Sequence, residues 1–157
     1  MAKADMFLKV KGQKYGPITG DSKDSDHKDE IEVLAWSWGI KAGDITGIAR
    51  SGKRSFLELQ IHKRVDPATT QLYQSAATNE VIVEAKLTCR RVSGDGKPVN
   101  YLVITINDAK VKSVTTRSGE PDTPSHLLEQ VSFVFRKVDI SYPPANRSFS
   151  DEWESGS

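Results

Sequence analysis

Apolar and polar residues alternate with period two in several separate segments of this chain, a pattern typical of half-buried β-strands. In residues 81–91, one face carries Val81, Val83, Ala85, Leu87 and Cys89. Similar alternation occurs in residues 6–11, 57–62, 101–111 and 131–142. The sequence therefore predicts a mainly β, mostly antiparallel domain.

The last of these segments changes phase part of the way along. Val131 and Phe135 share one parity, whereas Val138 and Ile140 have the other. A bulge or a strong twist is therefore expected at residues 136–137. The two prolines at 143–144 should end the strand.

One helix is predicted, beginning at about Pro67 and ending at about Thr78. Asp66 is a good N-cap, and proline suits the first helical position. Leu72 belongs to a narrow apolar stripe at helical spacing, and Asn79 can end the helix in a left-handed conformation.

The tryptophan pair at 36 and 38 should share one strand face with Leu34, while Ala35 and Ser37 face the opposite side. We interpret the tryptophans as part of a large core cluster. The expected core residues around them are Leu34, Trp36, Trp38 and Cys89.

Three polar segments are predicted to be loops: residues 12–29, 41–55 and 117–125. The second is basic, with Lys41, Arg50, Lys53 and Arg54 beside Asp44. The main domain should span residues 1–144. Residues 145–157 form a polar tail that we expect to be mobile, although its two aromatic residues could dock elsewhere.

The sequence offers little for catalysis or for a bound cofactor. The single cysteine excludes an intrachain disulfide, and His27, His62 and His126 lie apart without partners at metal-ligand spacing. No phosphate-binding glycine motif is present, and the acidic residues 21–30 lack the spacing of a calcium loop. We therefore predict no enzymatic activity, no metal and no cofactor.

Charge and hydropathy limit the location and the partners. The formal net charge is +1, which gives no general electrostatic attraction for nucleic acid. The N-terminus lacks the apolar core of a signal peptide, and no stretch reaches the length of a membrane span. The chain is expected in the cytoplasm, with any export by a route that needs no cleaved signal and no membrane insertion.

A sheet of many strands must close, be covered, or pair its edges with another chain, and a head-to-tail contact that closes makes a ring. The alternation alone does not choose among these. A monomeric β-barrel that binds a small ligand therefore stays open.

Several motifs resemble the haemolysin-coregulated protein (Hcp) family, the tube subunit of bacterial type VI secretion. The most specific lies in GDSKDSDHKDEIEVLAWSWG, residues 20–39. Residues 5–9 (DMFLK), 63–80, 87–114 and 127–144 resemble other parts of the family pattern, so the resemblance covers residues 3–144.

The resemblance implies two packed antiparallel sheets that close into a β-barrel with one flanking helix. It also implies hexameric rings that stack into a tube inside a contractile sheath, exported with a trimeric spike at the tip. The lumen of such rings can carry or chaperone small effector proteins. The tail-tube protein of a phage-like contractile particle, which shares this architecture, is the alternative.

Within that arrangement, Ser37 and Ala35 are hypothesised to face the lumen. The loop at residues 41–55 is the candidate for contact between rings. Its residues in that role are Lys41, Asp44, Arg50, Lys53 and Arg54.

Overall fold

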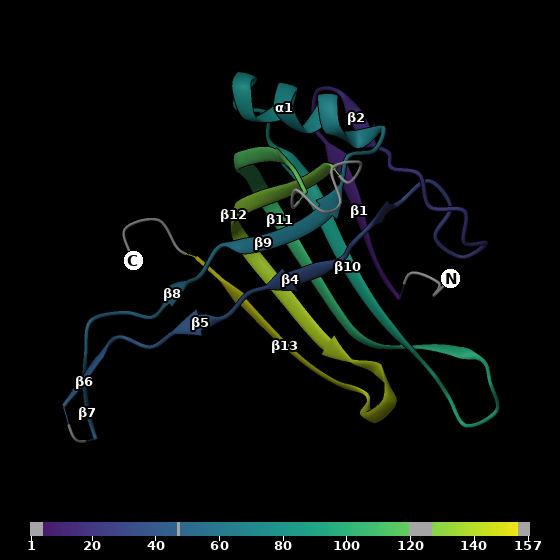
Figure 1. Ribbon diagram of the computed structural model, residues 1–157. Helices are drawn as coiled ribbons and strands as arrows, with labels where there is room; N and C mark the ends of the chain where they lie inside the picture. The colour runs from purple at the N-terminus through teal and green to yellow at the C-terminus, as the bar shows by residue number, and fades with distance from the viewer. Residues whose placement is uncertain (1–4, 47, 120–126, 154–157) are drawn as a thin grey trace.

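The computed structural model describes residues 5–46, 48–119 and 127–153 (Figure 1). This part contains the α-helix α1 (Ala68–Thr78), the short 3-10 helix η1 (Pro143–Ala145) and thirteen strands. The longer strands are β1 (Met6–Gly12), β9 (Leu59–Arg64), β10 (Ile82–Val92), β11 (Pro98–Ser118), β12 (Leu127–Tyr142) and β13 (Arg147–Glu152). The shorter strands are β2 (Gly16–Ile18), β3 (Ile31–Glu32), β4 (Ala35–Ser37), β5 (Ile40–Lys41), β6 (Asp44–Thr46), β7 (Ala49–Ser51) and β8 (Ser55–Phe56).

Nine strands form one antiparallel sheet in the order β2-β1-β10-β11-β12-β9-β4, with β13 paired to β12 and β3 paired to β1. β5 pairs with β8 and β6 with β7 in two small separate ladders. These two ladders make a narrow arm, residues 40–56, which extends away from the sheet at the lower left of Figure 1.

The expected closure into a barrel is wrong for this chain, because the sheet stays open between β1 and β9. β3 bonds to β1 and β4 bonds to β9, so a single segment reaches both ends of the sheet. Val33 and Leu34 leave the strand conformation between β3 and β4. No continuous strand therefore joins the two ends, and the sheet curves without closing.

Three neighbouring strands change their buried parity along one line across the sheet. The buried residues step from Ile82 to Ala85 in β10, from Ile106 to Ala109 in β11, and from Phe133 to Val138 in β12. The change of face seen in the sequence near residues 136–137 is thus present, whereas the register shift between β11 and β12 lies between Val111 and Ser113. The change of face belongs to a bend shared by three strands.

Val83, Asp108 and Arg136 stand opposite one another at this bend, which we call the bend row. Ile82 pairs with Ala109 and Glu84 with Asn107, so the pairing register continues across the bend without an inserted residue. Asp108 has a positive φ of 50°. Val83, expected on the apolar face, is 39% exposed because the strand turns over at this point.

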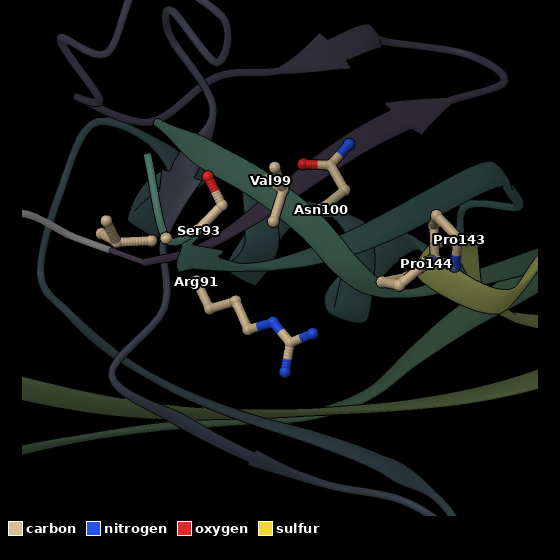
Figure 2. A pocket seen from close by; sticks show the side chains of 8 residues that line it. Arg91, Ser93, Val99, Asn100, Pro143 and Pro144 are labelled. Carbon is tan, nitrogen blue, oxygen red and sulfur yellow. The ribbon is translucent and has the colours of Figure 1, made fainter. Parts of the chain in front are cut away.

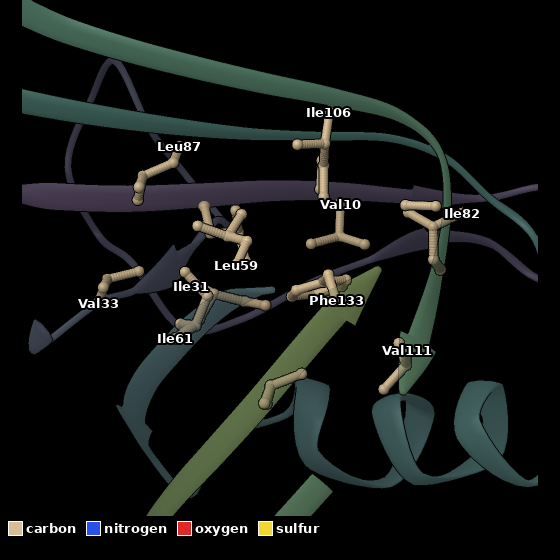
Figure 3. Packing of buried hydrophobic residues seen from close by; sticks show 14 of the residues in the cluster. Val10, Ile31, Val33, Leu59, Ile61, Ile82, Leu87, Ile106, Val111 and Phe133 are labelled. Atoms are coloured by element: carbon tan, nitrogen blue, oxygen red, sulfur yellow. The ribbon is translucent and has the colours of Figure 1, made fainter. Parts of the chain in front are cut away.

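The core lies inside the curve of the sheet (Figure 3). Side chains from β1, β3, β9, β10, β11 and β12 converge there. Its fully buried members include Leu8, Ile31, Ile61, Leu87, Ile104, Ile106 and Phe133. Burial of such side chains contributes roughly 1.5–3 kcal/mol each, so this cluster is the main source of stability.

Helix α1 closes one end of the curved sheet and begins and ends close to where the sequence predicts. The N-cap residue is Pro67 and not the predicted Asp66, which lies just before it and accepts a 2.9 Å hydrogen bond from the Ala68 amide. Leu72 is buried against the core. Asn79 ends the helix in the left-handed conformation, with φ 58°.

The described part of the tail is ordered as a strand of the sheet. Residues 147–152 form β13, which pairs with β12 from Tyr142↔Arg147 to Lys137↔Glu152. The turn between the two strands is η1, followed by Asn146 in the left-handed conformation. The expectation of a mobile tail is therefore wrong for β13, because its backbone completes one edge of the sheet.

Candidate functional site

The two faces of the segment at residues 35–38 differ in burial. Trp36 in β4 and Trp38 just after it are half-buried and pack against the core. Ala35 and Ser37 are exposed on the opposite side of the strand. Cys89 is buried, and burial raises the pKa of its thiol above the usual range.

Leu34 does not join the core, contrary to the sequence expectation. Its side chain is 40% exposed, whereas its neighbour Val33 is buried. The break between β3 and β4 shifts the parity by one, because Val33 bonds to Met6 of β1 and Leu34 bonds to His62 of β9. The exposed side of this segment therefore presents Leu34, Ala35 and Ser37 together.

Leu34 and Ala35 line a shallow pocket of about 350 Å³ beside the buried Lys63 and Glu129. Lys63 is a lysine at a core position of β9 and donates to Glu129 at 2.7 Å. It also lies 2.9 Å from Asp66. Burial raises the pKa of the Asp66 carboxyl against the lowering effect of the Lys63 ammonium. This ion cluster joins β9, β12 and the start of α1.

The arm has more structure than the loop that the sequence predicts. Its base is the β5–β8 ladder and its tip is the β6–β7 ladder. Lys41 and Lys53 are exposed, and the side chains of Asp44 and Arg50 lie outside the described part of the structure. Ile48 at the tip is fully exposed.

Arg54 at the base of the arm points back to the molecule's own tail. Its guanidinium donates two 2.8 Å hydrogen bonds to the Asp151 carboxylate of β13. A third, also 2.8 Å, goes to the carbonyl oxygen of Glu152. The Arg54 guanidinium beside Asp151 holds the pKa of that carboxyl below its usual range. Sequence reasoning missed this pair, which joins residues far apart in the chain.

The acidic segment at residues 20–30 also packs against the sheet. Phe7 of β1 lies between the His27 ring, 4.5 Å away and nearly parallel, and the Arg90 guanidinium, 4.7 Å away. Arg90 in turn bonds to Asp24 at 2.7 Å, and His27 bonds to Glu30 at 3.0 Å. The segment predicted to be a polar loop is thus held against the sheet by the contacts of His27 and Arg90 with Phe7.

No group of three or more potential metal ligands occurs among the described residues. His27 and His62 lie in separate places, and His126 is outside the described residues. No helix in the described part of the chain has the length and apolar character to cross a bilayer.

A pocket of about 590 Å³ lies between the β10–β11 turn and η1 (Figure 2). Arg91 is the single ionisable side chain among its described lining residues. Its guanidinium packs over the Tyr101 ring at 5.3 Å.

The arm and the side of β4 that carries Ala35 and Ser37 are both exposed in the described structure. A family model described as "Type VI secretion system effector, Hcp" matches residues 7–142. Protein hcp1 of Pseudomonas aeruginosa is 35% identical over 144 residues, which cover 89% of this chain and 83% of that protein. The Major exported protein of the same organism is 23% identical over 163 residues.

Solved structures share the fold. The Hcp1 protein from E. coli EAEC 042 matches with a TM-score of 0.85 at 22% identity, covering 98% of this chain and all of that one. Hcp1 from Salmonella typhimurium matches with a TM-score of 0.72 at 26% identity, covering 93% and 92% of the two chains. Together with the match over residues 7–142, these likenesses show that the chain belongs to the Hcp family, the secreted tube proteins of type VI secretion.

Proposed function

We propose that six copies of this chain form a ring and that the rings stack into the inner tube of a type VI secretion system. The tube would lie inside a contractile sheath, carry a trimeric spike at its tip, and hold small effector proteins in its lumen. The chain would be made in the cytoplasm and delivered out of the cell with the tube. Its role is structural, not catalytic.

The arm is the observation that carries this proposal. It extends from the sheet and ends in the fully exposed side chain of Ile48. Exposing an isoleucine in water is unfavourable by roughly 1.5–3 kcal/mol relative to burying it, so a binding partner would gain that contribution. A second ring, presenting the same surface six times, is a partner to which each arm could bind. Lys41 and Lys53 would lie at the edge of this contact.

The exposed side of β4 is the proposed lumen face. Ala35 and Ser37 are small, so they would leave the channel open. Leu34 adds an apolar contact beside them, and the pocket next to Leu34 makes this surface uneven. A mixed surface of this kind suits contacts with several unlike protein cargoes.

The ring is tested by the mass of the purified protein in solution and by electron microscopy. A hexamer should have about six times the chain mass of 17.4 kDa, with ring-shaped particles. A monomer at micromolar concentration would contradict the proposal.

The role of the arm is tested by Ile48→Ser. This variant should still form hexamers but should stack less, as measured by sedimentation and by counting stacked rings in micrographs. Val65→Ser is the matched control, since Val65 is also an exposed aliphatic residue but lies beside α1. Equal loss of stacking in both variants, or no loss in the first, would argue against the arm.

The lumen face is tested by Ser37→Gln, which adds bulk without charge. Rings should form normally, whereas co-purification of an effector should fall. Failure to fold or to form rings would show that Ser37 lies in a packed contact and not in the lumen.

A further inference from the structure

The arm cannot fix its own direction relative to the sheet. Its base ladder has the pairs Ile40↔Phe56 and Lys41↔Ser55, next to a 2.9 Å hydrogen bond from the Leu57 amide to the Gly39 carbonyl oxygen, and its tip ladder has three pairs. An isolated two-stranded ribbon is marginally stable in water. The direction of the arm must therefore depend on contacts that its base makes with the rest of the molecule.

Charge-assisted hydrogen bonds supply one such contact. Arg54 binds both oxygens of Asp151 with Nε and Nη2, and Nη2 also binds the carbonyl oxygen of Glu152. A two-point contact between a planar guanidinium and a planar carboxylate restricts rotation as well as distance. Both side chains are about three-quarters buried, so water screens the pair less than it would on an open surface.

Aromatic packing supplies a second contact at the same place. The Phe56 ring stacks on Phe135 of β12 at 5.3 Å and meets the edge of Trp153 at 6.2 Å. The Arg54 guanidinium covers the Phe56 ring at 5.6 Å. Phe56 is thus surrounded by the sheet, the tail and its own neighbour in the arm.

The tail can hold the base of the arm in place because its own backbone is fixed in the sheet. β13 pairs with β12 along its whole length, and the Trp153 amide bonds to the Arg136 carbonyl oxygen at 2.6 Å. Asp151 and Trp153 are therefore held by the backbone before they meet the arm.

We propose that β13 is a brace that sets the direction of the arm, with Asp151 and Trp153 as positioning residues for contact between rings. The inference rests on the proposed role of the arm in stacking. It assigns to the last described strand a part in assembly that is separate from the fold of the domain.

The test measures the arm itself and stacking separately. Hydrogen–deuterium exchange of peptides within residues 40–56 reports arm order, and sedimentation reports stacking. Asp151→Asn keeps the shape of the side chain but removes its charge. Arm exchange should rise roughly three- to tenfold, as expected for a weakened, partly screened charged hydrogen bond. Trp153→Leu should act in the same direction.

Glu152→Gln is the matched control. Its side chain pairs with Arg136 at 3.3 Å and both partners are about half exposed, so arm exchange should be unchanged. The double variant Arg54→Asp with Asp151→Arg swaps the two charges. If the pair acts as a unit, hydrogen–deuterium exchange of the arm should be slower in it than in Asp151→Asn.

The outcomes separate the two proposals. Unchanged arm exchange in both Asp151→Asn and Trp153→Leu would overturn the brace, whatever happens to stacking. Faster arm exchange with normal stacking would keep the brace and overturn the role of the arm in stacking.

Discussion

The side-chain amide of Asn107 in β11 donates a 3.1 Å hydrogen bond to the carbonyl oxygen of Val83 in β10. Val83 belongs to the bend row, where neighbouring strands turn over together. The Asn107 side chain thus bonds to the Val83 carbonyl oxygen at the point where the β10–β11 pairing has no pair for Val83. The bend is thus supported by specific hydrogen bonding and by the left-handed conformation of Asp108.

Substitutions at Asp108 should report the strain at the bend. Asp108→Gly should stay within about 0.5 kcal/mol of the parent, since glycine accepts a positive φ but loses more chain entropy on folding. Asp108→Val should lower the free energy of unfolding by roughly 1–2 kcal/mol, because a β-branched residue strongly disfavours positive φ. Urea denaturation of both variants checks this. Similar stabilities for the two would show that the backbone at Asp108 carries no strain.

The buried Lys63 should be sensitive to truncation. Lys63→Met leaves the carboxylates of Asp66 and Glu129 buried without their cation, which costs roughly 3–5 kcal/mol when a buried pair is broken. Lys112→Met removes the partner of Glu58 in an exposed pair at 3.2 Å and should cost less than about 1 kcal/mol. Chemical denaturation of the two variants gives the comparison. Equal costs would mean that the Lys63 cluster is effectively solvated.

The pair between Asp24 and Arg90 should make stability depend on pH. Hydrogen bonding by the Arg90 guanidinium, opposed by some burial, lowers the pKa of the Asp24 carboxyl below its usual 3.8. A lowered folded-state pKa stabilises the protein above the unfolded value, and this contribution is lost as pH falls through the folded value.

Asp24→Asn should therefore be less stable than the parent at pH 7, by roughly 1 kcal/mol once solvent screening is allowed for. The difference should shrink as pH falls from the unfolded-state value of 3.8 through the lower folded-state pKa, because the carboxyl of the unfolded chain takes up its proton first. Melting temperatures measured from pH 7 to pH 2.5 follow this. A difference that does not change with pH would assign the effect to packing alone.

Gly12 should not tolerate a side chain. A Cβ atom there would stand 2.4 Å from Oε2 of Glu80. Glu80 cannot easily move, because it accepts hydrogen bonds from the Ser75 hydroxyl at 2.6 Å and the Tyr15 amide at 2.7 Å. Gly12→Ala should cost roughly 1–3 kcal/mol, as overpacking does. Gly94→Ala, with no atom within 4 Å, is the control and should be nearly neutral by thermal denaturation.

Local patterns in the sequence predict the regular elements well. The helix from Pro67 to Thr78 is marked by capping and by spacing within the helix itself. The change of face near residue 136 is visible as a switch of parity. In both cases the physical cause lies within a few residues of its effect.

Contacts between distant residues are less visible. The bond between Arg54 and Asp151 joins segments that only the fold brings together. Phe7 between His27 and Arg90 is another case, because the three residues come from separate parts of the chain. No local spacing marks either contact.

The open sheet and the exposed Leu34 have one common cause. A two-residue break between β3 and β4 lets one segment bond to β1 and then to β9. Residues 31–40 are largely apolar on both faces, so alternation could not locate the break. The family resemblance implies a closed barrel because a family pattern describes the overall architecture. It does not locate the end of each strand.

The order of strands also bears on how the chain folds. β10, β11, β12 and β13 are consecutive antiparallel neighbours, whereas β1 must pair with β10 from the other half of the sequence. Closing short loops costs less entropy than closing long ones, so we expect the C-terminal meander to form first. During synthesis on the ribosome, β1 would remain unpaired with β10 until β10 has emerged. Pulse-labelled hydrogen exchange during refolding should protect β11 and β12 before β1, and the reverse order would contradict this.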